Sequence, residues 1–159
     1  MKIKIGHSYD VHRLEEGYNL ILGGVKLEHD KGLVGHSDAD VLLHAITESL
    51  IGAMGLGDIG TFFPDTDPTY KGVDSMKLLI AIKNIVDEKG FVISNIDSTV
   101  YLEQPKLRPV IDIMRENISK NINIDITCIN IKATRGEKLG FVGREEGIAA
   151  ESVVLLTHD

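Results

Sequence analysis

The sequence predicts an α+β fold, a two-layer sandwich in which helices cover one face of a mixed β-sheet. Apolar and polar residues alternate in Ile3–His12 and Phe91–Leu102, as in strands with one buried face. Apolar residues recur every three or four positions in Val41–Leu50 and Met76–Val86, as in amphipathic helices. Such segments are mixed along the chain with long connections. We therefore expect one domain that spans residues 1–159.

The first elements follow from this alternation and from helix signals. Ile3–His12 is the opening strand, and Tyr18–Leu27 is a short hairpin that turns at a glycine pair. Glu28–Gly35 is expected to be a mobile polar connector. A helix then begins with Ser37 as its N-cap and Asp40 in a capping-box variant. This helix is expected to end near Gly55 and Gly57.

The rest of the chain alternates helix and strand. The expected elements are a helix from Asp74 or Ser75 to Lys89-Gly90, a strand over Phe91–Leu102 that Pro105 ends, a helix over Val110–Ile118 that closes at Asn121 and Asn123, a strand over Ile126–Thr134, a glycine-rich loop over Gly136–Gly147 and a last strand over Ile148–Leu156.

Two histidines and an aspartate are spaced so that they converge on one point. In the opening strand, a period of two puts Asp10 and His12 on one face. His44 lies one helical turn after Asp40, whose carboxylate could hold the ring through a hydrogen bond. If strand and helix meet, three ligands of the catalytic zinc type converge and a fourth position stays open. The alternative is that the histidines are structural and that Asp40 only compensates the helix dipole.

Composition limits the classes of function. The net charge of −7 argues against a nucleic-acid or membrane partner, because binders of anionic polymers and surfaces need basic patches. The single cysteine, Cys128, excludes an intrachain disulfide and is expected to be a small buried hydrophobe. Without a signal-peptide pattern or an apolar run of bilayer length, the expected location is cytoplasmic. His7, His29 and His158 lie on the opposite strand face or in charged or terminal contexts, so we interpret them as ordinary structural residues.

Two features indicate a partner copy. A chain of 159 residues is short for an enzyme that encloses a large substrate alone. The uncovered face of a one-sided sheet also needs a partner, unless its side chains simply face water. An oligomer with sites at its interfaces is therefore expected.

Three segments are suited to a phosphorylated ligand. The acidic loop over residues 57–68 could order around a polyol, although Asx turns that stiffen a surface loop explain it as well. Lys106 after Pro105 offers a cation beside free backbone donors, or else a solvated lysine. Ala133–Arg144 combines a hydroxyl, cations and glycines with Glu137, which could hold a hard cation such as Mg²⁺. Its glycines lack the Walker A order, so it is not a P-loop.

The chain carries long, uncommon motifs in register over essentially its whole length, namely Gly6–His12, His36–Asp40, Gly57–Gly60, Phe63–Asp67, Gln104–Lys106, Glu137–Phe141 and Gly143–Ala149. Together they closely resemble the family of 2-C-methyl-D-erythritol 2,4-cyclodiphosphate synthases of the non-mevalonate isoprenoid pathway. The resemblance implies that the 2-phosphate of 4-diphosphocytidyl-2-C-methyl-D-erythritol 2-phosphate attacks the β-phosphorus of its own diphosphate. The cyclic diphosphate forms and CMP leaves.

The resemblance also implies which residues act. Zn²⁺ would be bound by Asp10, His12 and His44, and Mg²⁺ or Mn²⁺ by Glu137 together with the substrate phosphates. The expected catalytic residues are His36 and Arg135. The expected substrate contacts are Asp10, His12, His36, Ser37, Asp58, Ile59, Gly60, Phe63, Pro64, Asp65, Thr66, Asp67, Leu102, Glu103, Gln104, Pro105, Lys106, Leu107, Arg108, Thr134, Arg135, Gly136, Glu137, Phe141 and Arg144.

Members of this family are homotrimers whose sheets pack around the threefold axis and whose active sites are shared between neighbours. The resemblance implies the same assembly here. Arg144 and Glu146 would lie near the axis, where family members can have an apolar cavity suited to an isoprenoid diphosphate.

The chain departs from the family pattern at Arg135. The family usually has a run of threonines before the glutamate, and a threonine hydroxyl is expected to contact phosphate and assist the transition state. Here the sequence is Thr134-Arg135-Gly136-Glu137. An arginine could supply a charged hydrogen bond instead, or it could turn to solvent. Our hypothesis is that Arg135 contacts phosphate.

The expected chemistry does not depend on a protein nucleophile. The sequence has no Ser-His-Asp arrangement or activated cysteine, and a phosphate on the substrate needs neither. Catalysis would come from folding the substrate and from two cations that withdraw charge from the reacting phosphorus. Two alternatives stay open. A zinc-dependent phosphohydrolase would give linear products, and a nucleotide or isoprenoid-diphosphate binding trimer with structural zinc would bind without turnover.

Overall fold

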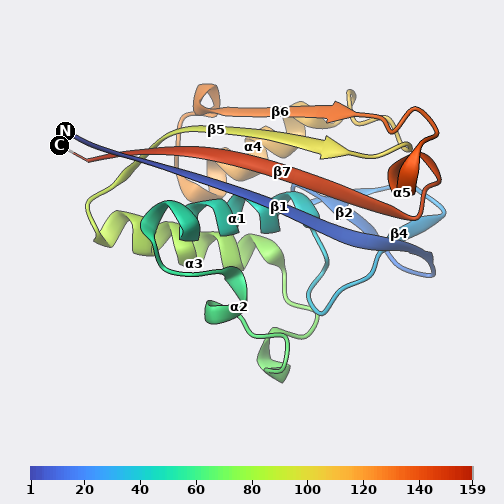
Figure 1. The fold of residues 1–159 in the computed structure, drawn as a ribbon, viewed down its shortest axis with the longest axis horizontal. Helices are drawn as coiled ribbons and strands as arrows, with labels where there is room; N and C mark the ends of the chain where they lie inside the picture. The colour runs from blue at the N-terminus through green and yellow to red at the C-terminus, as the bar shows by residue number, and fades with distance from the viewer. Residues whose placement is uncertain (159) are drawn as a thin grey trace.

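The computed structural model describes residues 1–158, in which a five-stranded sheet carries helices (Figure 1). The strand order is β4 (Lys31–Leu33), β1 (Lys2–Glu16), β7 (Gly147–His158), β5 (Val92–Tyr101) and β6 (Ile129–Thr134). β5 and β6 run parallel, whereas the other neighbouring strands are antiparallel. The predicted α+β class with a mixed sheet is confirmed.

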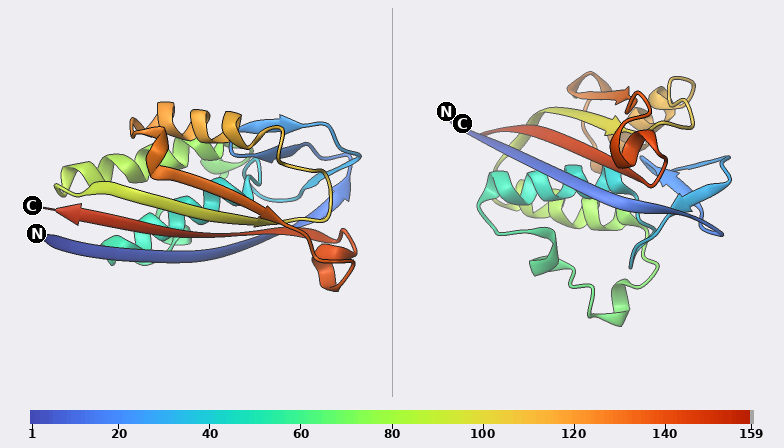
Figure 2. Two further views of the ribbon diagram at one scale, coloured as in Figure 1. Left: turned by 90° about the horizontal axis from the view of Figure 1, so that it is seen from above. Right: turned by 45° about the vertical axis from the view of Figure 1, so that its right-hand side comes forward.

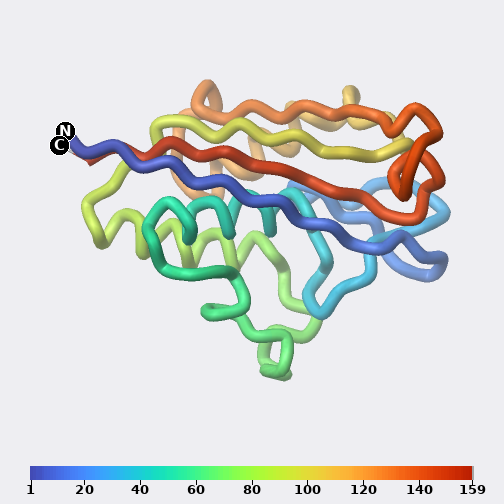
Figure 3. Tube along the Cα trace, in the orientation of Figure 1, coloured from blue at the N-terminus to red at the C-terminus, as the bar shows by residue number. Residues whose placement is uncertain are grey.

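The other elements surround this sheet. They are the hairpin β2 (Leu20–Leu22) and β3 (Val25–Leu27), the helices α1 (Val41–Met54), α2 (Ile59–Phe62), α3 (Ser75–Glu88), α4 (Ile111–Ile122) and α5 (Gly140–Gly143), and the 3₁₀ turns η1 (Pro68–Tyr70) and η2 (Ile126–Cys128). Seen from above, α3 and α4 lie on one side of β5 and β7 (Figure 2). The two chain ends lie side by side, because β1 and β7 pair along nearly their whole lengths (Figure 3). No helix within residues 1–158 is long and apolar enough to cross a membrane.

Alternation along the strands separates a covered face from an open one. In β1 the buried positions are Gly6, Ser8 and Leu14, which alternate with exposed neighbours. α1 packs on this covered face, across β1 and β7. Its approach is close at Gly6, where a Cβ atom would lie 1.8 Å from the carbonyl oxygen of Ser49. Glycine at this position therefore lets α1 lie directly on β1, which brings residues of the helix and the strand to one site.

The open face of the sheet carries several exposed apolar side chains. The strand register places Ile5 beside Leu155 and His7 beside Val153. Ile5 is 68% exposed, a large fraction for an isoleucine in the middle of a strand. The exposed large apolar residues of β1, β5 and β7 are Ile3, Ile5, Tyr9, Val11, Val92 and Val153.

The structure corrects several predicted boundaries. The first helix begins at Val41 with Asp40 as its N-cap, so Ser37 is not the cap. Glu28–Gly35 is not simply a connector, because β4 within it pairs with β1. Cys128 lies half-buried at the end of η2 instead of being buried within a strand, and β6 begins only at Ile129. The acidic loop and the glycine-rich loop also contain short helical turns.

Asp40 is the polar centre of the packing around α1. Its side chain is fully buried and accepts hydrogen bonds from the backbone N–H groups of Leu43 (3.1 Å), Gly23 (3.0 Å) and Gly24 (2.8 Å). It therefore caps α1 and fixes the β2–β3 turn at the same time. Complete burial raises the pKa of the Asp40 carboxyl to about 6, and the N–H donors limit that rise.

Replacing Asp40 by asparagine is expected to lower the free energy of unfolding by about 1–3 kcal/mol, because only one acceptor oxygen then faces three donors. A carboxyl whose pKa is higher in the folded than in the unfolded state contributes stability at low pH, which is lost as the pH rises through about 6. The stability gap between wild type and Asp40→Asn should therefore narrow from about pH 4 to about pH 7. Urea denaturation of both proteins across this range measures the gap, and a gap that widens with pH contradicts the prediction.

Candidate functional site

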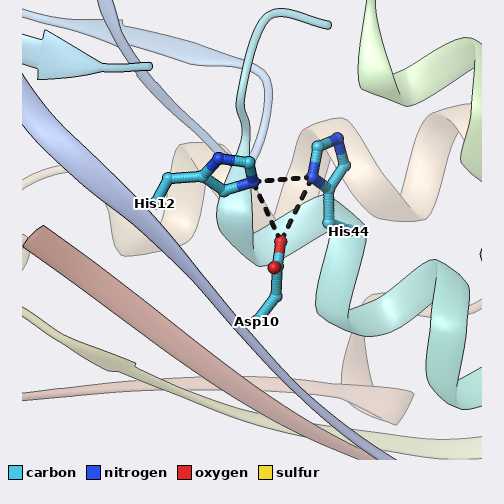
Figure 4. Close-up of side chains that lie close together, drawn as sticks. All are labelled: Asp10, His12 and His44. Atoms are coloured by element: carbon cyan, nitrogen blue, oxygen red, sulfur yellow. Dashed lines mark hydrogen bonds and ion pairs between the residues drawn. The ribbon is translucent and has the colours of Figure 1, made fainter. Parts of the chain in front are cut away.

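Asp10, His12 and His44 converge, as the strand and helix periodicities predict. The distances are 3.1 Å from His12 Nε2 to Asp10 Oδ2, 3.2 Å from His44 Nδ1 to Asp10 Oδ2, and 3.2 Å between the two ring nitrogens. In Figure 4 the two rings and the carboxylate point toward one another from β1 and α1. Within the described part of the chain, no other group of three or more His, Cys, Asp and Glu side chains is close enough to bind a metal ion.

Hydrogen bonding and charge prepare these side chains as ligands. The carbonyl oxygen of Val34 lies 2.8 Å from His12 Nδ1, so this nitrogen carries the proton and Nε2 directs its lone pair toward the other two residues. Burial acts against charge at Asp10, but hydrogen bonds and charge from His12 and His44 hold the pKa of this carboxyl well below its usual range. Burial likewise opposes protonation of His12, yet Asp10 keeps the pKa of His12 above its usual value. Asp10 is therefore ionised at neutral pH.

The donor set fits a divalent metal ion. Ligand atoms bound tetrahedrally at 2.0–2.1 Å are separated by about 3.3 Å, and the observed separations of 3.1–3.2 Å are close to that value. Two imidazole nitrogens and one carboxylate oxygen are typical zinc ligands. All three side chains line a cavity of about 260 Å³, which leaves room for a further ligand.

The predicted support of His44 by Asp40 is wrong. Asp40 is turned toward three backbone N–H groups of α1 and the β2–β3 turn, and it makes no hydrogen bond to the imidazole. His44 Nε2 instead lies 2.8 Å from Ser75 Oγ and 3.0 Å from Ser37 Oγ. The four-residue spacing placed Asp40 on the correct helical face, but its position at the N-cap gave it other partners.

The cavity lined by Asp10, His12 and His44, called the metal-side cavity below, contains some of the predicted substrate contacts. Its lining includes His36 and Ser37 before α1, and Ile59, Phe63 and Asp65 from the segment that projects below the sheet (Figures 1 and 2). Asp58, Gly60, Pro64, Thr66 and Asp67 belong to the same segment but do not line the cavity.

Turn capping explains two of the carboxylates outside this cavity. Asp58 accepts hydrogen bonds from Thr61 N (3.0 Å) and Thr61 Oγ1 (2.9 Å), and Asp67 accepts one from Thr69 N (2.9 Å). The Asx-turn interpretation of the acidic loop therefore holds for both. The carbonyl oxygen of Asp67 also lies 3.1 Å from His36 Nε2. This contact connects the acidic loop to a residue that lines the metal-side cavity.

A second cavity, of about 490 Å³, lies between two segments that contain expected substrate contacts, Leu102–Arg108 and the stretch that ends in Thr134 and Arg135. Gly136 N donates to Glu103 Oε2 at 2.9 Å and so joins them. The lining consists of Leu102, Glu103, Pro105, Lys106, Leu107, Arg108, Ile111, Asn130, Ile131, Lys132, Ala133, Thr134 and Arg135. Four of these side chains are cationic, and Lys132 is already paired with Asp97 at 2.6 Å. The cavity can therefore receive an anionic ligand that also has an apolar part.

The remaining predicted residues lie outside both cavities. Gln104 lies between two lining residues of the second cavity, and Gly136 and Glu137 follow its last lining residue, but none of the three lines the cavity, and Glu137 is exposed. Glu137 does not belong to the Asp10–His12–His44 group. Phe141 and Arg144 line a third cavity of about 460 Å³, together with His12, Glu145 and Glu146. Within one chain, the residues of the expected site are thus divided among separate cavities.

Sequence reasoning missed several residues at the metal-side cavity. Glu48 lines it and accepts hydrogen bonds from Ser8 Oγ (2.6 Å) and Ile59 N (3.3 Å). Its position one helical turn after His44 was the available signal. Ser75 had been interpreted only as a helix start, although it contacts His44. Tyr70, Val73 and Leu78 complete the lining, and no local pattern identifies them.

Comparison with known proteins gives a consistent result. The profile of the YgbB family matches residues 3–157. The chain is 58% identical over 154 residues to a 2-C-methyl-D-erythritol 2,4-cyclodiphosphate synthase of Clostridioides difficile, a match that covers 97% of this chain and 96% of the relative. A relative of the same name from Bacillus velezensis is 54% identical over 153 residues, covering 96% of this chain and 97% of the relative.

Solved structures agree with these relatives. The bifunctional IspDF of Campylobacter jejuni superposes with a TM-score of 0.95 at 44% identity, and the match covers 99% of this chain but only 43% of that longer chain. The CDP complex of IspF from Plasmodium falciparum superposes with a TM-score of 0.87 at 34% identity, covering 99% of this chain and 97% of the other.

Proposed function

The chain belongs to the YgbB family, and from this premise we propose that it is a 2-C-methyl-D-erythritol 2,4-cyclodiphosphate synthase of isoprenoid precursor biosynthesis. The proposed substrate is 4-diphosphocytidyl-2-C-methyl-D-erythritol 2-phosphate. The bond that forms joins the 2-phosphate oxygen to the β-phosphorus, and the bond that breaks releases CMP. The enzyme is then a phosphorus–oxygen lyase, and its expected location is the cytoplasm.

The observation that carries this proposal is the convergence of Asp10, His12 and His44 beside a cavity that also contains His36 and Ser37. Zn²⁺ is the proposed ion at these three ligands, and Mg²⁺ or Mn²⁺ the proposed ion at Glu137. When bound, the two ions would neutralise phosphate charge and polarise the reacting phosphorus. The acidic chain, with a net charge of −7, would otherwise repel a strongly anionic substrate.

The protein's own side chains would bind and fold the substrate. Leu102 and Leu107 in the second cavity offer apolar contacts for the cytosine ring. Lys106, Arg108 and Arg135 offer charge for the diphosphate. In the metal-side cavity, Phe63 and Ile59 would pack against the methylerythritol carbons, while His36 and Ser37 would contact the phosphate. A substrate held at both ends is bent, which brings its 2-phosphate toward the β-phosphorus.

The assembly proposed for this chemistry is a homotrimer with active sites shared between neighbours. Two observations support it. The open sheet face carries exposed apolar side chains such as Ile5 and Val153, which burial against another copy would remove from water. The metal-side cavity and the second cavity have no lining residue in common, as expected if an active site is assembled from parts of two chains.

Phosphorus NMR tests the reaction directly. Protein loaded with Zn²⁺ and Mg²⁺ is incubated with the proposed substrate, and cyclic diphosphate should appear together with an equal amount of CMP. Linear phosphate products would identify a metal-dependent phosphohydrolase instead. Binding of the substrate without any turnover would identify a binding protein.

Replacement of Arg135 by threonine tests the departure from the family pattern. Arg135 lines the second cavity beside Lys106 and Arg108, and within residues 1–158 its side chain makes no ion pair. If it contacts phosphate, kcat/KM should fall by about tenfold, which corresponds to about 1.4 kcal/mol. Lys120→Thr on α4, which removes a cation paired with Glu116, is the control and should leave kcat/KM unchanged. Unchanged rate and substrate affinity in Arg135→Thr would count against a charged contact between Arg135 and phosphate.

A further inference from the structure

The second ring nitrogen of His44 is held by groups that belong to neither the strand nor the helix of the metal ligands. His44 Nδ1 faces Asp10 and His12, so Nε2 points away from them, toward Ser75 Oγ at 2.8 Å and Ser37 Oγ at 3.0 Å. Ser75 is the first residue of α3 and is fully buried. The orientation of this imidazole therefore depends on a long-range contact between α1 and α3.

Counting donors and acceptors decides which way the hydrogen bond runs. Asp38 Oδ1 accepts a short hydrogen bond from Ser75 Oγ, and Asp38 Oδ2 accepts one from Ser75 N at 3.1 Å. A carboxylate only accepts, so the single hydroxyl proton of Ser75 is directed to Asp38. The lone pairs of Ser75 Oγ are then free to accept from His44 Nε2–H. In this arrangement Nε2 carries the proton of the neutral ring and Nδ1 keeps its lone pair.

Ser37 is placed differently. Its hydroxyl oxygen accepts a hydrogen bond from Ala39 N at 3.2 Å, and its side chain lines the metal-side cavity, which Ser75 does not. The two hydroxyl oxygens are 3.5 Å apart. Ser37 is therefore available to a ligand in the cavity, whereas Ser75 is buried and committed to Asp38.

We propose that Asp38 and Ser75 are positioning residues that hold His44 in its Nε2-protonated tautomer and so direct the Nδ1 lone pair at the metal ion. This inference rests on the metal site proposed above. It assigns the role of ordering His44 to a hydroxyl that links the imidazole to a carboxylate on a different segment. It also leaves the Ser37 hydroxyl free for the substrate.

Zinc affinity provides the first test. Zn²⁺ alone is titrated into metal-free protein in competition with a chromophoric chelator, with wild type, Ser75→Ala and Asp38→Asn compared. Both variants should bind Zn²⁺ about 10–100-fold more weakly than wild type, the range found when such outer partners are removed. Asp74→Asn, the same change at the residue before Ser75, and Ser37→Ala are the controls and should keep the wild-type affinity.

The tautomer of His44 provides the second test, because a general loss of stability would not move the proton from one ring nitrogen to the other. Nitrogen-15 NMR of the metal-free protein should show His44 protonated at Nε2 in wild type and a mixture of tautomers in Ser75→Ala. Ser75→Thr keeps the hydroxyl and should restore both the Nε2–H signal and the zinc affinity, provided that thermal unfolding shows it to be folded. Ser75→Ala removes one buried hydroxyl and no backbone donor, so it decides the question if Asp38→Asn fails to fold.

The outcomes separate this inference from the proposed function. Wild-type protein that binds no Zn²⁺ contradicts the metal site and the inference together. Wild-type protein that binds Zn²⁺ while Ser75→Ala and Asp38→Asn bind it equally well contradicts the inference alone. A loss in Ser37→Ala as large as that in Ser75→Ala also overturns it, because Ser37 would then be the group that holds Nε2.

Discussion

Replacing His44 by alanine is expected to lower cyclodiphosphate formation by at least about 1000-fold, which corresponds to about 4 kcal/mol of lost transition-state stabilisation. His44 Nδ1 is one of three ligand atoms at mutual distances of 3.1–3.2 Å, so its loss leaves Asp10 and His12 with an incomplete donor set. Zinc content should fall with turnover, because two ligands bind the ion far more weakly than three. Phosphorus NMR measures turnover, and atomic absorption measures the bound metal.

The loss in His44→Ala should not come from unfolding. Asp40 continues to cap α1, and the apolar residues of α1 that face the sheet are unchanged. Circular dichroism should therefore match the wild type. His29→Ala is a matched control, because His29 lies beside Asp30 and Glu145 and lines neither the metal-side nor the second cavity. A His44→Ala protein with wild-type turnover and zinc content would refute the proposed metal centre.

Local periodicity predicted that Asp10, His12 and His44 would converge, provided that the strand and the helix meet. Alternation in β1 determines that Asp10 and His12 share a face, and the amphipathic pattern of α1 determines which side of the helix His44 occupies. Both are short-range properties that each segment specifies by itself. The meeting of the two elements followed because the apolar faces of helix and strand must be buried against each other.

The partners of those ligands could not be predicted in the same way. Asp38 and Ser75 are 37 positions apart in sequence, and only the packing of α3 against α1 brings Ser75 to His44. Asp40 was assigned to His44 because four residues separate them, yet the N–H groups of Gly23 and Gly24 compete for its carboxylate from a distant hairpin. The same limit explains the missed strand β4, whose three residues carry too little pattern to indicate pairing with β1.

Trimers that combine two inactive variants are expected to show about a third of the wild-type activity if the active sites are shared between neighbouring chains. One variant is His44→Ala, which damages the metal-side cavity, and the other is Glu137→Ala, which removes the proposed second metal ligand. Glu137 lies outside the Asp10–His12–His44 group of its own chain. In every trimer that contains both variants, about one site in three combines the intact Asp10–His12–His44 group of one chain with the intact Glu137 of its neighbour.

Restored activity depends entirely on which chains supply the two halves of a site. If each chain formed a whole site by itself, every site in the mixture would carry one of the two defects and no activity would return. Co-expression of the two variants with different affinity tags, followed by purification on both tags, isolates oligomers that contain both kinds of chain. Oligomers of each variant alone, prepared in the same way, give the baseline. If the mixed oligomers are no more active than this baseline, the separate cavities of one chain act together. The exposed apolar side chains of β1 and β7 would then need another explanation than a shared active site.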